Sequence, residues 1–342
     1  MNDVSQSRAS PKRAAGAAVI LLYHRIAHLR CDPWGLAVSP EHFAEHLALL
    51  RKFGEPKPLA QIVNAVQRGE PIAAPTLAVT FDDGYADNLY NAAPLLERYD
   101  VPATVFLTTG YVGAAREFWW DEAERILFSP EELPARLRLV VAGRAAEWPL
   151  ERARYYLEDA RLSDREWFRD RLGSPSPRYE FFQAVHRLLL SLGDAERRRS
   201  LDDLNVWAGD ATSARQSHLC LSPEEVAALS RRELVEMGAH TVTHPSLPGL
   251  NEESQRRELR QSKLELEGLV GRRVTSFAYP YGQYAPETAN LARQEGFSSA
   301  CSTQAGAVKE TSDLFALPRV KVGDWDGERL ARTLAEWLPN EC

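Results

Sequence analysis

The residues with the clearest capacity for chemistry are two adjacent carboxylates and two histidines spaced four residues apart. Asp82 and Asp83 follow the apolar run 77–79, in the sequence Thr-Phe-Asp-Asp-Gly. His240 and His244 come about 160 residues later, in His-Thr-Val-Thr-His. Carboxylate oxygens and imidazole nitrogens are ligands of divalent metal ions. Neighbouring side chains on a turning backbone point in different directions, so one carboxylate can bind metal while the other acts as a base toward water. The two clusters therefore predict metal-assisted hydrolysis.

A third feature is the sequence Ala-Tyr-Pro-Tyr-Gly at 278–282, which follows the apolar run 274–277. Proline and glycine force a turn there, and a turn can leave backbone N–H groups pointing into a site. Such groups suit an oxyanion hole, where they meet the charge that develops on a tetrahedral intermediate.

Short apolar runs that alternate with amphipathic stretches must position these residues, and this pattern is typical of βα units around a parallel sheet. We predict strands at 18–23, 77–81, 103–108, 235–239, 274–279, 298–302 and 316–320. We predict helices between them at 40–51, 59–68, 88–98, 222–230, 252–270, 286–295 and 327–337. In a parallel barrel, functional residues lie at the carboxyl ends of the strands, where all three motifs fall.

The stretch 113–217 interrupts this rhythm and is rich in Arg, Glu and Trp. We predict that it is a mostly helical insertion, with helices at 119–128, 151–160 and 179–192 and a short hairpin around 137–148. It is either a scaffold or oligomer surface, or a lid over the substrate. The predicted organisation is a disordered segment at 1–16, a barrel made of 17–112 and 218–342, and the insertion between them.

Composition excludes several classes of protein. The chain is 44% apolar and 26% charged, as in a soluble globular protein, and its net charge of -7 argues against nucleic acid or an anionic membrane as partner. The apolar run 14–23 is too short to span a bilayer and lacks a small-residue cleavage site. The four cysteines are scattered, at 31, 220, 301 and 342, so we expect reduced thiols and a cytoplasmic location.

The three motifs together resemble those of the polysaccharide deacetylases (the NodB-homology enzymes of carbohydrate esterase family 4). Residues 80–84, 240–244 and 279–282 match the family motifs in the family order, each after a predicted strand. The resemblance covers most of 18–112 and 218–338. It implies a distorted (β/α)7–8 barrel and a metal-dependent hydrolase that acts on the amide of N-acetylated sugars.

The resemblance also implies residue roles. It makes Asp82 the general base, and Asp83, His240 and His244 the ligands of a divalent ion, most often Zn²⁺, with Co²⁺, Ni²⁺, Mn²⁺ or Fe²⁺ as alternatives. It makes the backbone N–H of Tyr281 the oxyanion donor. A further match, at position 243, is a threonine hydroxyl expected to tie the second motif to the loop that carries the aspartates.

The sequence departs from the family pattern in two places. It has no histidine within 245–342, where the general acid usually falls, and Thr-Ser-Phe at 275–277 replaces the usual arginine. Some family members carry a histidine at the end of the first strand, and His24 matches that position. We therefore predict that His24 is the general acid, since the first strand would neighbour the last in a closed barrel. We predict that Arg319 orients the Asp82 carboxylate in place of the missing arginine.

The remaining histidines and tryptophans receive structural interpretations. We expect His42 and His46 to form a partly exposed helix face without an acidic partner, and His186 and His218 to be structural. Trp119 and Trp120 could stack on sugar rings, but large aromatic residues belong more often to a core.

The predicted function is N-deacetylation of a saccharide, a glycoconjugate precursor or a glycosylated metabolite. The alternatives are hydrolysis of a non-sugar amide, formamide or cyclic amide, O-deacetylation, and saccharide binding without catalysis. An open groove with aromatic walls would favour sugars, whereas a small closed pocket would favour a non-sugar amide.

Overall fold

The computed structural model describes residues 16–72, 75–141, 143–170, 173–209 and 213–338. The predicted disordered segment lies outside these residues except for Gly16, and Cys342 also lies outside them. Seven strands form one curved parallel sheet, in the spatial order β11 (Ser299–Cys301), β10 (Ser276–Ala278), β9 (Val235–Ala239), β6 (Ala103–Leu107), β5 (Thr76–Phe81), β1 (Ala18–Tyr23) and β12 (Val320–Lys321). An eighth strand, β4 (Glu55–Pro56), pairs with β5. This sheet confirms the predicted distorted barrel.

The strands form because their side chains are apolar on both faces. All residues of β1 and β5 are buried, as in parallel sheets that are covered on both sides. The register brings the strand ends together, because Phe81 pairs with Tyr23 on one side and with Val105 on the other, and Leu107 pairs with Ala239. The residues that follow β1, β5 and β9 therefore lie at one edge of the sheet.

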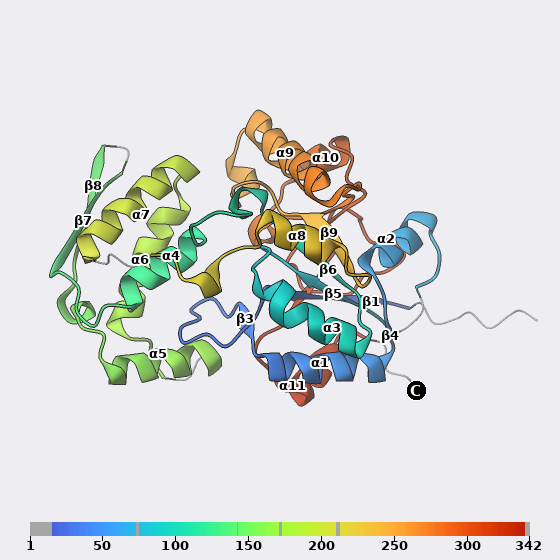
Figure 1. The fold of residues 1–342 in the computed structure, drawn as a ribbon, viewed down its shortest axis with the longest axis horizontal. Helices are drawn as coiled ribbons and strands as arrows, with labels where there is room; N and C mark the ends of the chain where they lie inside the picture. The colour runs from blue at the N-terminus through green and yellow to red at the C-terminus, as the bar shows by residue number, and fades with distance from the viewer. Residues whose placement is uncertain (1–15, 73–74, 142, 171–172, 210–212, 339–342) are drawn as a thin grey trace, which may run out of the picture.

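Helices surround the sheet, as Figure 1 shows. They are α1 (Pro40–Phe53), α2 (Leu59–Arg68), α3 (Ala93–Tyr99, preceded by a π-helical turn at Asn88–Ala92), α8 (Pro223–Ser230), α9 (Glu252–Val270), α10 (Pro286–Gln294) and α11 (Gly327–Ala335). Local sequence sets their ends: the Ser39 side chain accepts the His42 N–H at the start of α1, and Gly271 ends α9 in the left-handed region. Among the described helices, none has the length and apolar character needed to cross a bilayer.

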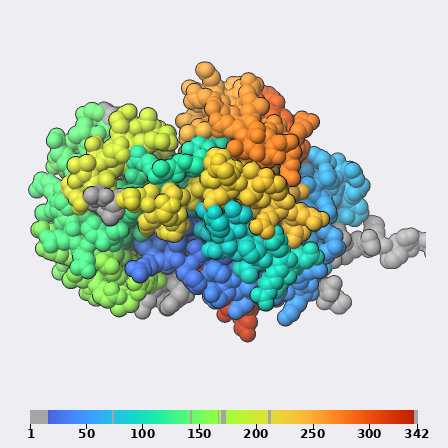
Figure 2. Space-filling model, in the orientation of Figure 1, coloured from blue at the N-terminus to red at the C-terminus, as the bar shows by residue number. Residues whose placement is uncertain are grey.

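The insertion forms a lobe beside the barrel, green in Figures 1 and 2. It contains α4 (Trp119–Phe128), a hairpin of β7 (Arg136–Val141) and β8 (Arg144–Pro149), a 3₁₀ turn at Glu151–Arg154, α5 (Glu158–Asp170), α6 (Pro177–Leu190) and α7 (Asp194–Ala208). These elements share a hydrophobic core of their own, in which Phe118, Leu137, Phe182 and Leu204 are buried. The predicted mostly helical insertion is thus present.

Two predicted elements are wrong in detail. The helix expected at 151–160 is a short 3₁₀ turn followed by extended chain, because Tyr156 donates its N–H to the Glu131 carbonyl over 2.8 Å instead of continuing a helix. The residues 316–320, expected to form one strand, contact two different strands that lie at opposite ends of the spatial order, β11 and β1. Leu317 bonds to Ala300 over 3.0 Å, and the regular strand β12 starts only at Val320, beside β1.

The prediction for the histidines of α1 is also wrong. His46 is fully buried, with Nε2 2.7 Å from the Trp325 carbonyl oxygen and Nδ1 3.3 Å from the Tyr23 hydroxyl. His42 has an acidic partner, since its Nδ1 lies 2.6 Å from Asp324. The segment between β12 and α11 folds over this face of α1, and the local sequence of α1 gave no sign of it.

We expect the burial of His46 to make stability fall in mild acid. Burial lowers the pKa of His46 to about 4, whereas the unfolded chain titrates near 6.5. The unfolded state therefore binds more protons between pH 6.5 and 4, and the free energy of unfolding falls as pH decreases through that window. When the pH is lowered from 7 to 4.5, the free energy of unfolding of the wild type should fall by about 2 kcal/mol more than that of His46→Gln. Urea unfolding measures this difference. An equal loss in both proteins would contradict this.

Candidate metal centre and active site

The loop after β5 holds Asp82 and Asp83 in fixed positions. Asp82 donates its N–H to the Tyr23 carbonyl over 3.0 Å, which extends the β1–β5 pairing by one residue. Asp83 and Gly84 then both have positive φ, 76° and 82°, so the two carboxylates point in different directions. A Cβ at Gly84 would lie 2.8 Å from a methyl carbon of Leu107, so a larger residue would force this turn to move.

Asp83 lies between the two histidines of the second motif. Its Oδ1 is 3.6 Å from His240 Nε2 and 3.3 Å from His244 Nε2, and all three residues are buried. A tetrahedral ion with ligands at about 2.1 Å needs separations of about 3.4 Å between ligand atoms. The three side chains are therefore spaced as ligands of one ion.

The hydrogen bonds of these residues also fit a metal ion. His240 Nδ1 lies 2.7 Å from the Ala278 carbonyl oxygen, so this nitrogen carries the proton and Nε2 presents its lone pair toward Asp83. Asp83 Oδ1 is buried and has no hydrogen-bond donor among the described residues. A buried carboxylate oxygen without a donor is costly unless a cation binds it. The donor set, two imidazoles and one carboxylate, suits Zn²⁺ and similar ions.

Arg319 fixes the other carboxylate. Its guanidinium donates two parallel hydrogen bonds to Asp82, each 2.7 Å long, and both side chains are buried. Arg319 is itself held by the Ser302 carbonyl at 2.9 Å and by Thr80 Oγ1 at 3.2 Å. Burial acts to raise the pKa of Asp82, but the Arg319 charge outweighs it and leaves that pKa at about 2. Asp82 is therefore ionised at neutral pH, and the two hydrogen bonds from Arg319 hold its carboxylate in one orientation.

Removing the arginine should destabilise the fold. In Arg319→Met, Asp82 would stay buried without a partner, and we expect the free energy of unfolding at pH 7 to fall by about 3–5 kcal/mol. Adding Asp82→Asn to that variant removes the uncompensated charge, so the double variant should recover part of the loss. Urea unfolding of the wild type, both single variants and the double variant measures the interaction free energy between Arg319 and Asp82. Additive effects of the two substitutions would refute it.

Residues with strained backbone conformations are concentrated in the three motifs. Six non-glycine residues of the described chain have positive φ, and four of them belong to the three motifs: Asp83, Thr241, His244 and Tyr281. Tyr281 is followed by Gly282, where a Cβ would lie 2.0 Å from the Thr303 hydroxyl. Residues in this region cost free energy and persist where the surrounding structure enforces them, often at functional sites.

His24 follows β1 and reaches the same cavity. Burial lowers its pKa to about 4, although the charges of Asp83 and Asp82 act in the opposite direction. His24 thus lies where the first and last strands of the sheet are neighbours, as predicted, and its burial favours the neutral ring.

The cavity has a volume of about 270 Å³ and brings together residues from distant parts of the chain. It is lined by His24, Trp34, Leu36, Asp82, Asp83, Trp120, His186, Leu190, His240, His244, Tyr281, Thr303 and Lys321. All the predicted catalytic and metal-binding residues line it except Arg319, which lies behind Asp82. His186, which was predicted to be structural, also lies at the cavity wall, because α6 brings it there. Trp34 and Lys321 were missed, since neither lies in a recognisable motif.

The expected role of Thr243 is wrong. Its hydroxyl donates to Glu258 of α9 over 2.8 Å and makes no bond to the aspartate loop. Glu258 also accepts the N–H groups of Val242 and Thr243. Helix α9 therefore shapes the second motif from outside the sheet.

Comparison with known proteins supports the same family. A family model described as polysaccharide deacetylase matches residues 70–134 and 204–300. The curated protein "Putative polysaccharide deacetylase YxkH" of Bacillus subtilis (strain 168) is 31% identical over 88 residues, which are 26% of this chain. The chain covers about a third of the length of that relative, 32%.

Solved structures share the fold at low sequence identity. Deacetylase PplD of Streptococcus pyogenes, in complex with acetate, is 18% identical, with a TM-score of 0.57 over 94% of this chain and 99% of that one. IcaB of Ammonifex degensii is also 18% identical, with a TM-score of 0.56 over 93% and 96%. The matched residues include both ends of the predicted insertion, 113–134 and 204–217, so the expectation that the resemblance stops at 112 and resumes at 218 is wrong. The fold is common to these deacetylases. The chain is thus similar to the polysaccharide deacetylases in part of its sequence and in its fold.

Proposed function

We propose that this protein is a metal-dependent N-deacetylase that hydrolyses the N-acetyl amide of a saccharide or glycoconjugate. One observation carries the proposal: an oriented carboxylate faces the same cavity as three side chains that are spaced to hold a metal ion. The similarity to polysaccharide deacetylases supports the saccharide, and the aromatic side chains of the cavity wall fit a sugar ring, whereas the volume of about 270 Å³ also admits a small non-sugar amide.

Asp83, His240 and His244 would hold the ion, which we propose to be Zn²⁺. When bound, such an ion acts as a Lewis acid toward a carbonyl oxygen and lowers the pKa of water. Asp82 is placed to accept a proton from the attacking water, and Arg319 keeps its carboxylate turned toward the cavity. The Tyr281 backbone lies beside the cavity, and its N–H is our proposed donor to the oxyanion.

His24 is the proposed general acid, because an amine leaves poorly unless it is protonated. With its pKa lowered by burial, the neutral ring must first take up a proton before passing it to the leaving nitrogen. His24→Ala should lower turnover of an N-acetyl substrate by about 10²–10⁴-fold. Turnover of an O-acetyl ester should fall much less, since an alkoxide leaves more readily. Near wild-type turnover of the amide would exclude this role.

Acetate release tests the proposed activity. The panel contains N-acetylated sugars, nucleotide sugars, short oligosaccharides, a non-sugar N-acetyl amide and O-acetyl esters. Chelated protein is compared with the same protein after Zn²⁺ is restored. Metal-dependent release from a sugar amide would support the proposal. Release only from the non-sugar amide or only from esters would favour those alternatives, and no release despite bound metal would favour a binding protein.

We also propose a cytoplasmic location. Three cysteines of the described chain, Cys31, Cys220 and Cys301, are free thiols, and free thiols are usual in that compartment. Fractionation of the source cells tests it.

A further inference from the structure

The wall of the cavity opposite the sheet comes from outside the family motifs. Trp120 belongs to α4 and His186 and Leu190 to α6, so three wall residues are supplied by the insertion. Trp34 and Leu36 come from the loop between the short strands β2 (Arg25–Ile26) and β3 (Ala37–Val38).

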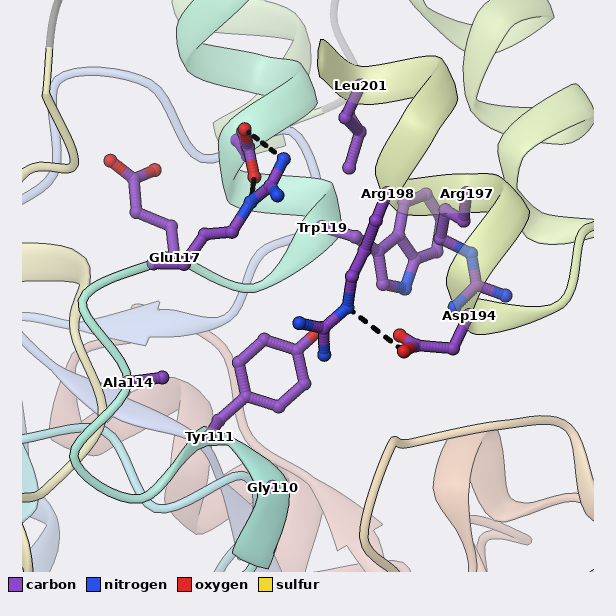
Figure 3. A pocket seen from close by; sticks show the side chains of 11 residues that line it. Gly110, Tyr111, Ala114, Glu117, Trp119, Asp194, Arg197, Arg198 and Leu201 are labelled. Carbon is purple, nitrogen blue, oxygen red and sulfur yellow. Dashed lines mark hydrogen bonds and ion pairs between the residues drawn. The ribbon is translucent and has the colours of Figure 1, made fainter.

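His186 is packed between two tryptophans. Its ring centroid lies 4.2 Å from that of Trp34 and 4.7 Å from that of Trp119. The Arg197 guanidinium covers the Trp119 ring at 4.9 Å, and its Nε donates to the Leu189 carbonyl over 2.9 Å, which links α7 to α6. Figure 3 shows Arg197 beside the Trp119 ring. The stack of Trp34, His186 and Trp119 is therefore held in place from behind.

Trp120 continues the wall to the metal ligands. Its ring centroid lies 4.8 Å from that of His244, and its Nε1 donates to the Tyr85 hydroxyl over 3.0 Å. Tyr85 follows the first motif and donates in turn to Asp121 over 2.7 Å. This chain of hydrogen bonds fixes the insertion to the aspartate loop, so the aromatic wall has a set position relative to Asp83.

The chemistry of the wall points to one kind of ligand. Among the described residues that line the cavity, the only acidic side chains are those of Asp82 and Asp83, and the wall opposite the sheet is aromatic or aliphatic. Thr303 and Lys321 also line the cavity, and Lys321 Nζ donates to the Trp34 carbonyl over 2.9 Å. The C–H face of a pyranose ring packs well against aromatic rings. A cavity of about 270 Å³ is smaller than the roughly 300–1,000 Å³ of pockets for drug-sized ligands, so it has room for one acylated ring.

We propose that the insertion and the β2–β3 loop form the substrate-binding wall, and that the substrate presents a single N-acyl sugar ring to it. The substrate is thus a monosaccharide derivative or the terminal unit of a glycoconjugate, and Trp34 and His186 determine specificity. This inference rests on the proposed function. It resolves the two interpretations of the insertion in favour of a substrate-binding role.

The first test separates binding from chemistry. For the methyl glycoside of N-acetylglucosamine, Trp34→Ala and His186→Ala should each raise KM by about tenfold and change kcat less than about threefold. Trp34→Phe and His186→Phe keep the aromatic stack and should retain a KM near that of wild type. Arg187→Ala, an exposed neighbour on α6, is the matched control and should change neither constant. Unchanged KM in both alanine variants would overturn the proposal.

The second test is chain length. The ratio kcat/KM should stay within about threefold from the mono- to the trisaccharide of N-acetylglucosamine, because only one ring contacts the wall. A rise of about tenfold or more with length would overturn the single-ring proposal. Calorimetry of the same methyl glycoside with Zn²⁺-loaded Asp82→Asn measures binding without turnover, and the Trp34→Ala substitution should weaken it about tenfold. Absence of acetate release from every sugar defeats the proposed function, whereas release with an unaffected KM defeats only this inference.

Discussion

Asp82→Asn is expected to lower kcat for N-acetyl hydrolysis by about 10²–10⁴-fold, the usual contribution of a general base. Asparagine keeps the size of the side chain but cannot accept a proton at neutral pH. Zinc content should remain at the wild-type level, because the three proposed ligands are unchanged. The measurement is steady-state acetate release together with metal analysis of the same dialysed sample.

Two controls make the loss specific. Asp100→Asn changes an exposed aspartate at the end of α3, where the left-handed backbone also suits asparagine, and should leave kcat unchanged. Thermal unfolding shows whether the buried Arg319 charge, left without its carboxylate partner, destabilises Asp82→Asn. A folded Asp82→Asn protein that retains more than a tenth of wild-type kcat would rule out Asp82 as the base.

His244→Ala is expected to have the larger effect, because it removes one of three proposed metal ligands. Zinc should be lost on dialysis, and activity should fall by more than about 10⁴-fold, since the attacking water then keeps a pKa of 15.7 instead of about 7. Chelation of the wild type should cause the same loss, and added Zn²⁺ should restore the wild type but not the variant at the same concentration.

The chain contains a matched control for this substitution. His42 and His46 have the same four-residue spacing, but they lie on α1 and contact Asp324, Trp325 and Tyr23. His42→Ala should retain zinc and activity. If His244→Ala keeps its zinc while His42→Ala loses it, the metal centre has been placed wrongly.

The βα units and the parallel sheet could be predicted from the sequence, because their main signals are local. Strand β1 and helices α2, α4 and α9 have the predicted bounds, since apolar runs and helix-capping residues specify them without help from distant contacts. Residues that follow parallel strands meet at one edge of the sheet. The grouping of Asp82, Asp83, His240 and His244 therefore followed from recognising the two strands that precede them.

Contacts between residues far apart in the chain could not be predicted from local pattern, because they depend on how the elements pack. The contact of Arg319 with Asp82 joins positions 237 apart, and the sequence suggested it solely through the absence of an arginine elsewhere. The burial of His46 depends on a segment that reaches α1 from the far end of the chain. His186 and Trp34 carry no motif, and they form the cavity wall because α6 packs against the β2–β3 loop. The local pattern of apolar residues determines the helices and strands. The cavity wall depends on how these elements pack on one another, and the periodicity of the sequence does not encode that packing.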